Sequence, residues 1–156
     1  MINNDVLRSI RYMLDLSDAR VVEIIHLADP SLATDKDAIH DFLRKEGEEG
    51  HVECPDAVLA HFLDGLVVYL RGRDETRPAR AIEKRVNNNL VLKKLRVAFE
   101  LKDVDMHQAF AEAGFPVSKP ELSALFRQHG HKNYRACGDQ MLRNFLKGLT
   151  RRVRSP

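Results

Sequence analysis

Apolar residues recur along the chain at the three- and four-residue spacing that places them on one face of an α-helix. The first set is Val6, Leu7, Ile10, Met13 and Leu14. The pattern predicts first helices over residues 3–15 and 88–100, second helices over 18–28 and 103–113, third helices after Asp35 and Ser118, and fourth helices from 54–56 to about Arg71 and from 137–139 to about Arg152. No window shows the alternation of a strand, so the predicted fold class is all-α.

The same sequence unit occurs twice. Residues 3–11, NNDVLRSIR, return as residues 88–96, NNLVLKKLR, at an offset of 85. Residues 54–66, CPDAVLAHFLDGL, return as residues 137–149, CGDQMLRNFLKGL, at an offset of 83. Ordered matches of this kind indicate a duplication, with two residues deleted between Leu101 and Leu125. We therefore expect two homologous four-helix units in tandem.

The repeat also predicts the domain organisation. We expect a first helical repeat over residues 1–72, a linker over 73–87 and a second helical repeat over 88–156. The linker segment is charged and contains Pro78, which is typical of a connection between units.

The charges of the chain are distributed unevenly between the two repeats. Residues 1–72 hold 7 Lys and Arg against 14 Asp and Glu, a net charge of −7, whereas residues 73–156 hold 18 against 9, a net charge of +9. The overall charge of +2 conceals this polarity. Such an asymmetry bears on binding partners rather than on the fold.

Composition excludes several classes of protein. With 44% hydrophobic and 31% charged residues among 156, the chain has enough apolar side chains to form a core and is not compositionally disordered. No apolar run approaches the roughly 20 residues of a membrane span, and the amino-terminal residues do not resemble a secretory signal. We therefore expect a cytoplasmic protein without membrane contact. Its two cysteines, Cys54 and Cys137, are expected to be buried thiols rather than a disulfide.

The repeated motifs resemble those of a known family. An Asn-Asn-x-x-Leu-Arg/Lys opening and a Cys-x-Asp-x-x-Leu-x-x-Phe-Leu-x-Gly-Leu closing, each present twice, are similar to the YehS-like family of bacterial proteins. The clearest parts are Asn88-Asn89, Leu92-Lys93-Lys94-Leu95-Arg96 and Cys137-x-Asp139 through Gly148-Leu149. The resemblance covers nearly the whole chain and implies a small cytoplasmic bacterial protein with two copies of a domain of unknown function. It implies no activity, cofactor or catalytic residue.

Several repeated polar residues have structural interpretations. Asn3 or Asn4, and Asn88 or Asn89, are suited to capping the first helix of each unit.

Two arginines border the apolar stripe of these helices, and a buried arginine needs a partner. We predict structural ion pairs of Arg11 with Asp56 and of Arg96 with Asp139, each joining the first helix of a unit to its fourth. The alternative is an anion site formed by Arg11 or Arg96.

Glycines recur inside the fourth helices, at Gly65 and Gly148. A glycine there costs about 1 kcal/mol relative to alanine, so the repetition indicates a close approach between helices. A ligand passing over that helix is the less favoured interpretation.

No motif predicts catalysis, a metal or a cofactor. The chain has no Gly-rich phosphate loop and no nucleophile signature. His129 and His131 lie near Cys137, but the spacing fits no tetrahedral zinc site, and the first copy has Glu46 and Glu48 in their place. We therefore expect no enzyme, no metal and no cofactor.

The strongest electrostatic feature is a basic stripe in the fourth helix of the second copy. Arg143, Lys147, Arg151 and Arg154 are spaced by four, four and three residues, so they share one face of the helix. A wider cluster adds Lys132, Arg135, Arg152, Arg77, Arg80, Lys84 and Arg85. The alternative is a solvated face or a counter-surface for the acidic copy.

The middle of each unit also has the lengths of a helix-turn-helix, at 106–113, 114–117 and 118–128 in the second copy. The first copy offers Asp35, Asp37 and Asp41 in the corresponding helix, which phosphates would repel.

From these observations we expect a non-enzymatic binding or adaptor protein with a protein partner. The alternative is a nucleic-acid-binding accessory protein that uses the basic second repeat. Self-association through the acidic and basic halves is a further expectation.

Overall fold

The computed structural model describes residues 1–76, 78 and 81–155, and in that part of the chain it contains eight α-helices and no strand. The helices are α1 (Asn3–Leu14), α2 (Asp18–Ala28), α3 (Lys36–Phe42), α4 (Asp56–Arg71), α5 (Asn88–Ala98), α6 (Asp103–Glu112), α7 (Lys119–Leu125) and α8 (Asp139–Arg154). The all-α prediction is confirmed. Arg77 and Arg80 of the predicted basic cluster lie outside the described residues.

The chain divides into two compact units, Met1–Val86 and Asn87–Pro156, each with four helices in the same order. The described residues between α4 and α5 form no helix or strand. The Val86 backbone N–H donates a hydrogen bond of 3.1 Å to the carboxylate of Asp56. The end of the connecting segment is therefore attached to the first turn of α4 and belongs structurally to the first unit.

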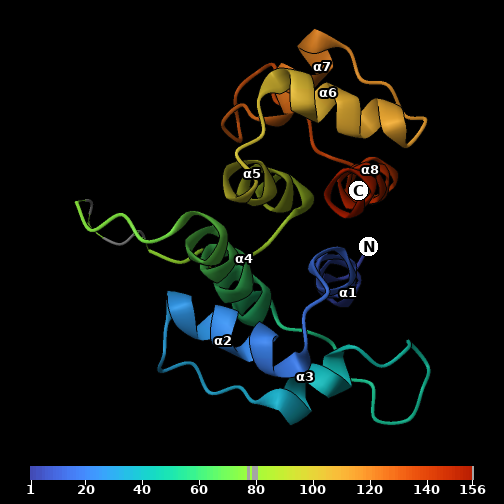
Figure 1. The fold of residues 1–156 in the computed structure, drawn as a ribbon. Helices are drawn as coiled ribbons and strands as arrows, with labels where there is room; N and C mark the ends of the chain where they lie inside the picture. Colours follow the sequence, from blue (N-terminus) through green and yellow to red (C-terminus); the bar gives the residue numbers. More distant parts are fainter. Residues whose placement is uncertain (77, 79–80, 156) are drawn as a thin grey trace. The chain divides into compact units, whose positions relative to one another are not determined.

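Within each unit the most extensive contact joins the second helix to the fourth, α2 to α4 and α6 to α8 (Figure 1). A glycine lies at each crossing. A Cβ atom on Gly65 would lie 1.8 Å from the carbonyl oxygen of Ile24, and a Cβ on Gly148 would lie 1.7 Å from that of Ala109. The close helix approach predicted from the repeated glycines is therefore confirmed. No side chain fits there, because a peptide group of the neighbouring helix occupies the space.

Each unit has its own apolar core, made from equivalent positions. Ile10 of α1 and Leu95 of α5 are fully buried, and so are Phe62 of α4 and Phe145 of α8. Full burial of a side chain of this size contributes about 1.5–3 kcal/mol.

The corner after the first helix uses the same backbone geometry in both units. Asp15 and Glu100 follow α1 and α5 with φ angles of 54° and 53°, in the left-handed region that non-glycine residues rarely adopt. The next residue then closes the helix: the Leu16 N–H donates to the Arg11 carbonyl at 2.9 Å. Leu101 makes the same bond to Arg96. This turn satisfies the last carbonyls of the helix and sets where α2 and α6 begin.

The glycine crossings lead to a prediction about stability. Gly148→Ala should destabilise the second unit by about 2–3 kcal/mol, because α8 must move away from α6, even though alanine is the better helix former. Lys147→Ala, one residue away on the exposed side, is the matched control and should change stability by less than about 0.5 kcal/mol. Urea unfolding followed by circular dichroism measures both. Equal stability of the two variants would contradict the close crossing.

Candidate functional site

Helix α8 presents a basic face to solvent. Arg143, Lys147, Arg151 and Arg154 are all exposed, and helix geometry places them within an arc of about 80° and a length of about 16 Å. The opposite side of α8 is buried through Met141, Leu142, Phe145, Leu146, Gly148 and Leu149. We refer to the four cations as the basic face of α8. The only acid in α8 is Asp139, in its first turn.

The cations of the basic face are engaged to different degrees. Arg151 donates a hydrogen bond of 2.7 Å to the carbonyl oxygen of Glu112, the last residue of α6. A cation at this position stabilises the carboxyl end of a helix. Arg143 makes only a 3.4 Å contact with Gln140 of its own helix, and Lys147 has no hydrogen bond or ion pair with any described residue. The middle of the basic face is therefore open to a ligand.

Two other predicted basic residues lie on the segment between α7 and α8, not on the helix face. Arg135 forms an ion pair of 2.8 Å with Glu121 in the first turn of α7. The pKa of Glu121 is lowered, chiefly by the hydroxyl and backbone amide of Ser118 and then by Arg135. Arg135 is thus committed to its own unit. Lys132 is exposed and pairs with none of the described residues.

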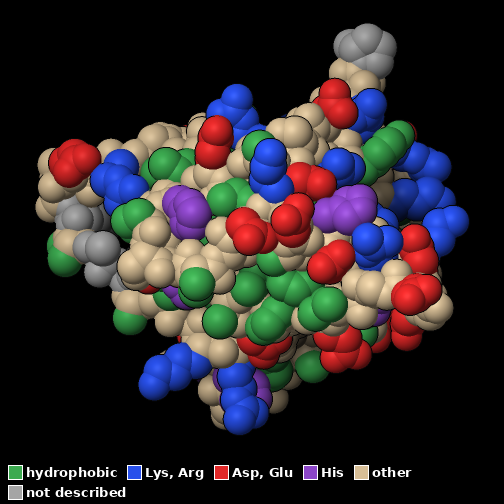
Figure 2. Space-filling view, turned by 90° about the horizontal axis from the view of Figure 1, so that it is seen from below, with side chains coloured by type: hydrophobic (Ala, Val, Ile, Leu, Met, Phe, Trp, Pro, Cys, Tyr) green, Lys and Arg blue, Asp and Glu red, His purple; other side chains and the backbone are tan. Residues whose placement is uncertain are grey.

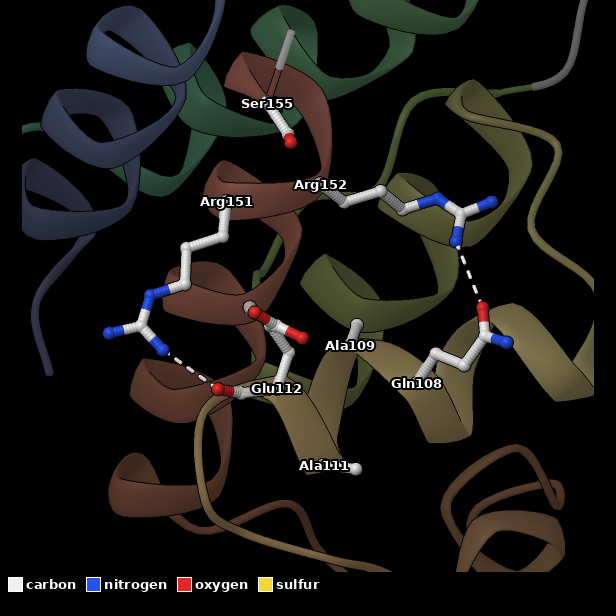
Figure 3. Close-up of a pocket in the computed structure, with 8 residues that line it drawn as sticks. Gln108, Ala109, Ala111, Glu112, Arg151, Arg152 and Ser155 are labelled. Atoms are coloured by element: carbon white, nitrogen blue, oxygen red, sulfur yellow. Dashed lines mark hydrogen bonds between the residues drawn. The ribbon is translucent and has the colours of Figure 1, made fainter.

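A cavity of about 620 Å³ adjoins the basic face where α6 crosses α8. Its lining consists of Gln108, Ala109, Ala111, Glu112, Gly148, Arg151, Arg152 and Ser155. Arg151 and Arg152 extend to opposite sides of this space, and Glu112 rises from the end of α6 between them (Figure 3). We call it the α6–α8 cavity. Sequence reasoning did not find it, because its residues come from two helices that meet only in the folded unit.

Arg152 forms one wall of the α6–α8 cavity and is held by two contacts. It pairs with Asp105 at 2.9 Å and donates to the side-chain oxygen of Gln108 at 3.3 Å (Figure 3). The pKa of Asp105 is lowered, first by the backbone amide of Lys102 and also by Arg152. The guanidinium of Arg152 is therefore oriented before any ligand arrives.

The predicted ion pairs between first and fourth helices are wrong in their partners. Arg11 contacts Asp18 at 3.3 Å rather than Asp56, and Arg96 contacts Asp103 rather than Asp139. Both arginines reach the first residue of the next helix, where the chain turns its corner. Arg11 and Arg96 are 40% and 29% exposed, so these pairs are surface contacts worth at most about 1 kcal/mol. Asp18 and Asp103 also recur in the repeat, and that signal could have identified them.

Asp56 and Asp139 instead accept hydrogen bonds from asparagines. The side-chain amide of Asn3 donates to Asp56 at 2.6 Å and to the Cys54 carbonyl at 3.0 Å. Asn88 repeats the arrangement with Asp139 at 2.8 Å and with the Cys137 carbonyl at 2.9 Å. The aspartates thus hold the first helix of each unit against the fourth through an amide rather than a guanidinium.

The second asparagine of each pair joins three segments, and it is buried in the first unit and half-buried in the second. Asn4, only 1% exposed, donates to the carbonyls of Phe42 and Val52 at 2.8 Å and accepts the N–H of Cys54 at 2.9 Å. Asn89 makes the equivalent bonds in the second unit, to Leu125, Arg135 and Cys137. The capping role expected of these asparagines is wrong: they lie inside the helices, and α5 is capped by Asn87.

Both cysteines are buried, free thiols, as predicted. Burial raises the pKa of Cys54 to about 12, with a further contribution from Asp56. Burial likewise raises the pKa of Cys137 to about 11. A thiol of this kind carries almost no thiolate at neutral pH, so packing accounts for these residues and nucleophilic chemistry does not.

The corresponding surface of the first unit has the opposite character. Asp64 of α4 stands at the position of Lys147 and Val68 at that of Arg151. The segment between α3 and α4 exposes four glutamates, Glu46, Glu48, Glu49 and Glu53. On the side where α2 and α3 lie, acidic side chains border a central apolar area (Figure 2).

Other classes of site find no support in the described residues. No group of three His, Cys, Asp or Glu side chains is arranged there as metal ligands would be. None of the described helices has the length and apolar character of a membrane span. The segment 118–128, expected as the second helix of a helix-turn-helix, contains the seven-residue α7 (Lys119–Leu125).

The fold defines an all-helical protein built from two copies of one four-helix unit. Both copies match the family described as "Protein of unknown function (DUF1456)", over residues 3–72 and 88–155. The chain is 49% identical over 152 residues to the uncharacterized protein YehS of Escherichia coli (strain K12), covering 97% of this chain and 96% of that protein. The chain belongs to this family, as its motifs indicated. No solved structure matches it significantly.

The asparagine tie predicts a measurable effect from a small change. Asn89→Asp should destabilise the second unit by about 1–2 kcal/mol at pH 7, because a half-buried carboxylate would face the Leu125 and Arg135 carbonyls without donating to them. Asn87→Asp is the matched control, since aspartate caps a helix as well as asparagine, and it should be nearly neutral. Thermal unfolding at pH 7 compares the two. A neutral Asn89→Asp would refute the tie.

The raised thiol pKa values predict low reactivity. In the native protein at pH 8, Cys54 and Cys137 should resist alkylation by iodoacetamide, because burial keeps both thiols protonated. In urea both should react completely. Mass spectrometry after timed alkylation measures this, and rapid native labelling of either cysteine would show that the thiols are accessible and ionised.

Proposed function

We propose that this protein is a non-enzymatic binding protein whose second unit binds nucleic acid through the basic face of α8. The observation that supports the proposal is the exposure of four cations on one side of one helix, whose only acid is Asp139 in the first turn. Phosphate backbones are bound by such rows of Lys and Arg, and the binding is largely independent of sequence.

The charge of the two units supports the same assignment. The first repeat has a net charge of −7 and is repelled by phosphate. The second repeat therefore makes the contact with nucleic acid. Arg143 and Lys147 are the central residues, because neither forms an ion pair with a described acidic residue, although Arg143 lies near enough to Asp139 to help lower the pKa of that carboxyl. Lys132, on the segment before α8, extends the positive surface of the same unit.

A protein ligand is the competing possibility, either an acidic partner or a second copy of this chain through its acidic repeat. The exposed large apolar residues of the second unit are Val97 and Val104, within the described residues. Charge rather than apolar area therefore characterises the exposed surface of this unit.

The proposal predicts binding that depends strongly on salt. The full chain should bind a labelled 20-nucleotide RNA or DNA at low salt, with a slope of log affinity against log salt near −0.7 to −0.9 for each phosphate contacted. Arg143→Glu with Lys147→Glu should lower the affinity at least about tenfold and reduce the slope by about 1.5. Fluorescence anisotropy at several salt concentrations measures both quantities.

The matched control is Lys93→Glu with Lys119→Glu, two exposed lysines on α5 and α7. It makes the same change in net charge away from the basic face. Equal losses in the two double variants would mean that net charge alone attracts the ligand. Absence of binding to RNA and DNA at low salt would overturn the proposal and leave a protein partner as the ligand, including a second copy, which sedimentation would detect.

A further inference from the structure

The α6–α8 cavity contains a carboxylate, that of Glu112, whose position the basic face does not explain. The carboxylate of Glu112 rises into the space between α6 and the last turns of α8 (Figure 3). It has no hydrogen bond or ion pair with any described residue, although Arg151 donates to the carbonyl oxygen of the same residue. Arg152, on the other side, is bound to Asp105 and Gln108. An acceptor group is thus left open in a strongly basic unit.

An unpaired carboxylate decides what kind of group can enter this cavity. It accepts hydrogen bonds from N–H donors and repels an anion placed directly beside it, while the guanidinium groups of Arg151 and Arg152 border the same space. Ala109, Ala111 and Gly148 also line the space with small groups. The crossing itself is closed, because the Ala109 peptide group fills the position beside Gly148. Gln108 and Ser155 offer further polar atoms at the rim. The cavity therefore suits a group that presents N–H donors to Glu112.

The position of the cavity connects it to the basic face. Arg151 belongs to both surfaces, so phosphates lying along Arg143, Lys147 and Arg151 would bring their bases to the cavity mouth. Proteins that recognise single strands hold the backbone electrostatically and take unstacked bases into polar pockets, where hydrogen bonds read the base edges.

The first unit serves as an internal comparison for the same helix crossing. Gly65 and Ile24 reproduce the close contact of Gly148 and Ala109. At the positions of Glu112, Arg151 and Arg152 the first unit has Leu27, Val68 and Tyr69. The helix crossing therefore does not require these polar groups. They occur in the unit that also carries the basic face.

We propose that the α6–α8 cavity binds an unpaired nucleobase that presents two adjacent N–H donors to Glu112, as the Watson–Crick edge of guanine does. This inference rests on the proposed function and refines it, because a base can enter the cavity only from a single strand. The basic face of α8 holds the phosphates, and Glu112 discriminates among bases.

The test compares guanosine and inosine 5′-monophosphate, which differ only by the 2-amino group that donates the second hydrogen bond. Titration of the full chain followed by amide NMR should show shifts confined to the ends of α6 and α8. Guanosine monophosphate should bind about tenfold more tightly than inosine monophosphate. Glu112→Gln should remove that preference, and Glu100→Gln, an exposed acid at the α5–α6 corner, should retain it.

Separate outcomes distinguish this inference from the proposed function. Equal binding of the two nucleotides, or no response to Glu112→Gln, would overturn the base site, while salt-dependent binding of an abasic oligonucleotide would leave the basic face of α8 as the nucleic acid surface. Selective binding of guanosine monophosphate without oligonucleotide binding would support the cavity and overturn the proposed function.

Discussion

The contact between a helical glycine and a peptide group of the neighbouring helix determines the shape of each unit. Gly65 on Ile24 and Gly148 on Ala109 bring the fourth helix against the second at backbone distance. Because α8 buries Gly148 against α6 and its other apolar residues in the core of the unit, the remaining side of the helix, which carries the basic face, is exposed. The same contact places Arg151 and Arg152 on either side of the end of α6, which creates the α6–α8 cavity. Structure and candidate function thus depend on one crossing.

The duplication shows which residues serve the scaffold and which serve the surface. The asparagine ties, the left-handed corner residues and the crossing glycines occur in both units, with partners at equivalent positions. The positions outside the core of α4 and α8 differ, with half-buried Asp64 and Val68 in one unit and exposed Lys147 and Arg151 in the other. A buried polar group without its partner costs free energy, so the ties cannot change singly. Exposed side chains carry no such constraint, and the two surfaces therefore have opposite charge.

The motif residues that stand out most in the sequence have structural roles. Asn4 and Asn89 each satisfy two carbonyl groups and one amide at the junction of three segments, and the cysteines pack beside them. Such irregular segments have no helix or strand to pair their backbone groups, so a side-chain amide with both donors and an acceptor substitutes for it. The motif residues therefore join the segments of each unit, and they do not identify its ligand.

The amino-acid sequence alone determined the all-α class, the order of the helices, the duplication and the polarity of charge. Each of these follows from local periodicity or from comparing the chain with itself. The common face of Arg143, Lys147, Arg151 and Arg154 was also predictable, since helix geometry relates residues three and four apart. Tertiary structure alone decided the partners of Arg11 and Arg96, the role of the asparagines and the existence of the cavity. Those features join segments far apart in the chain, and the repeat offers several equivalent acids, Asp18 and Asp56 among them, for every arginine. Which acid lies within reach depends on how the helices pack, and periodicity does not contain that information.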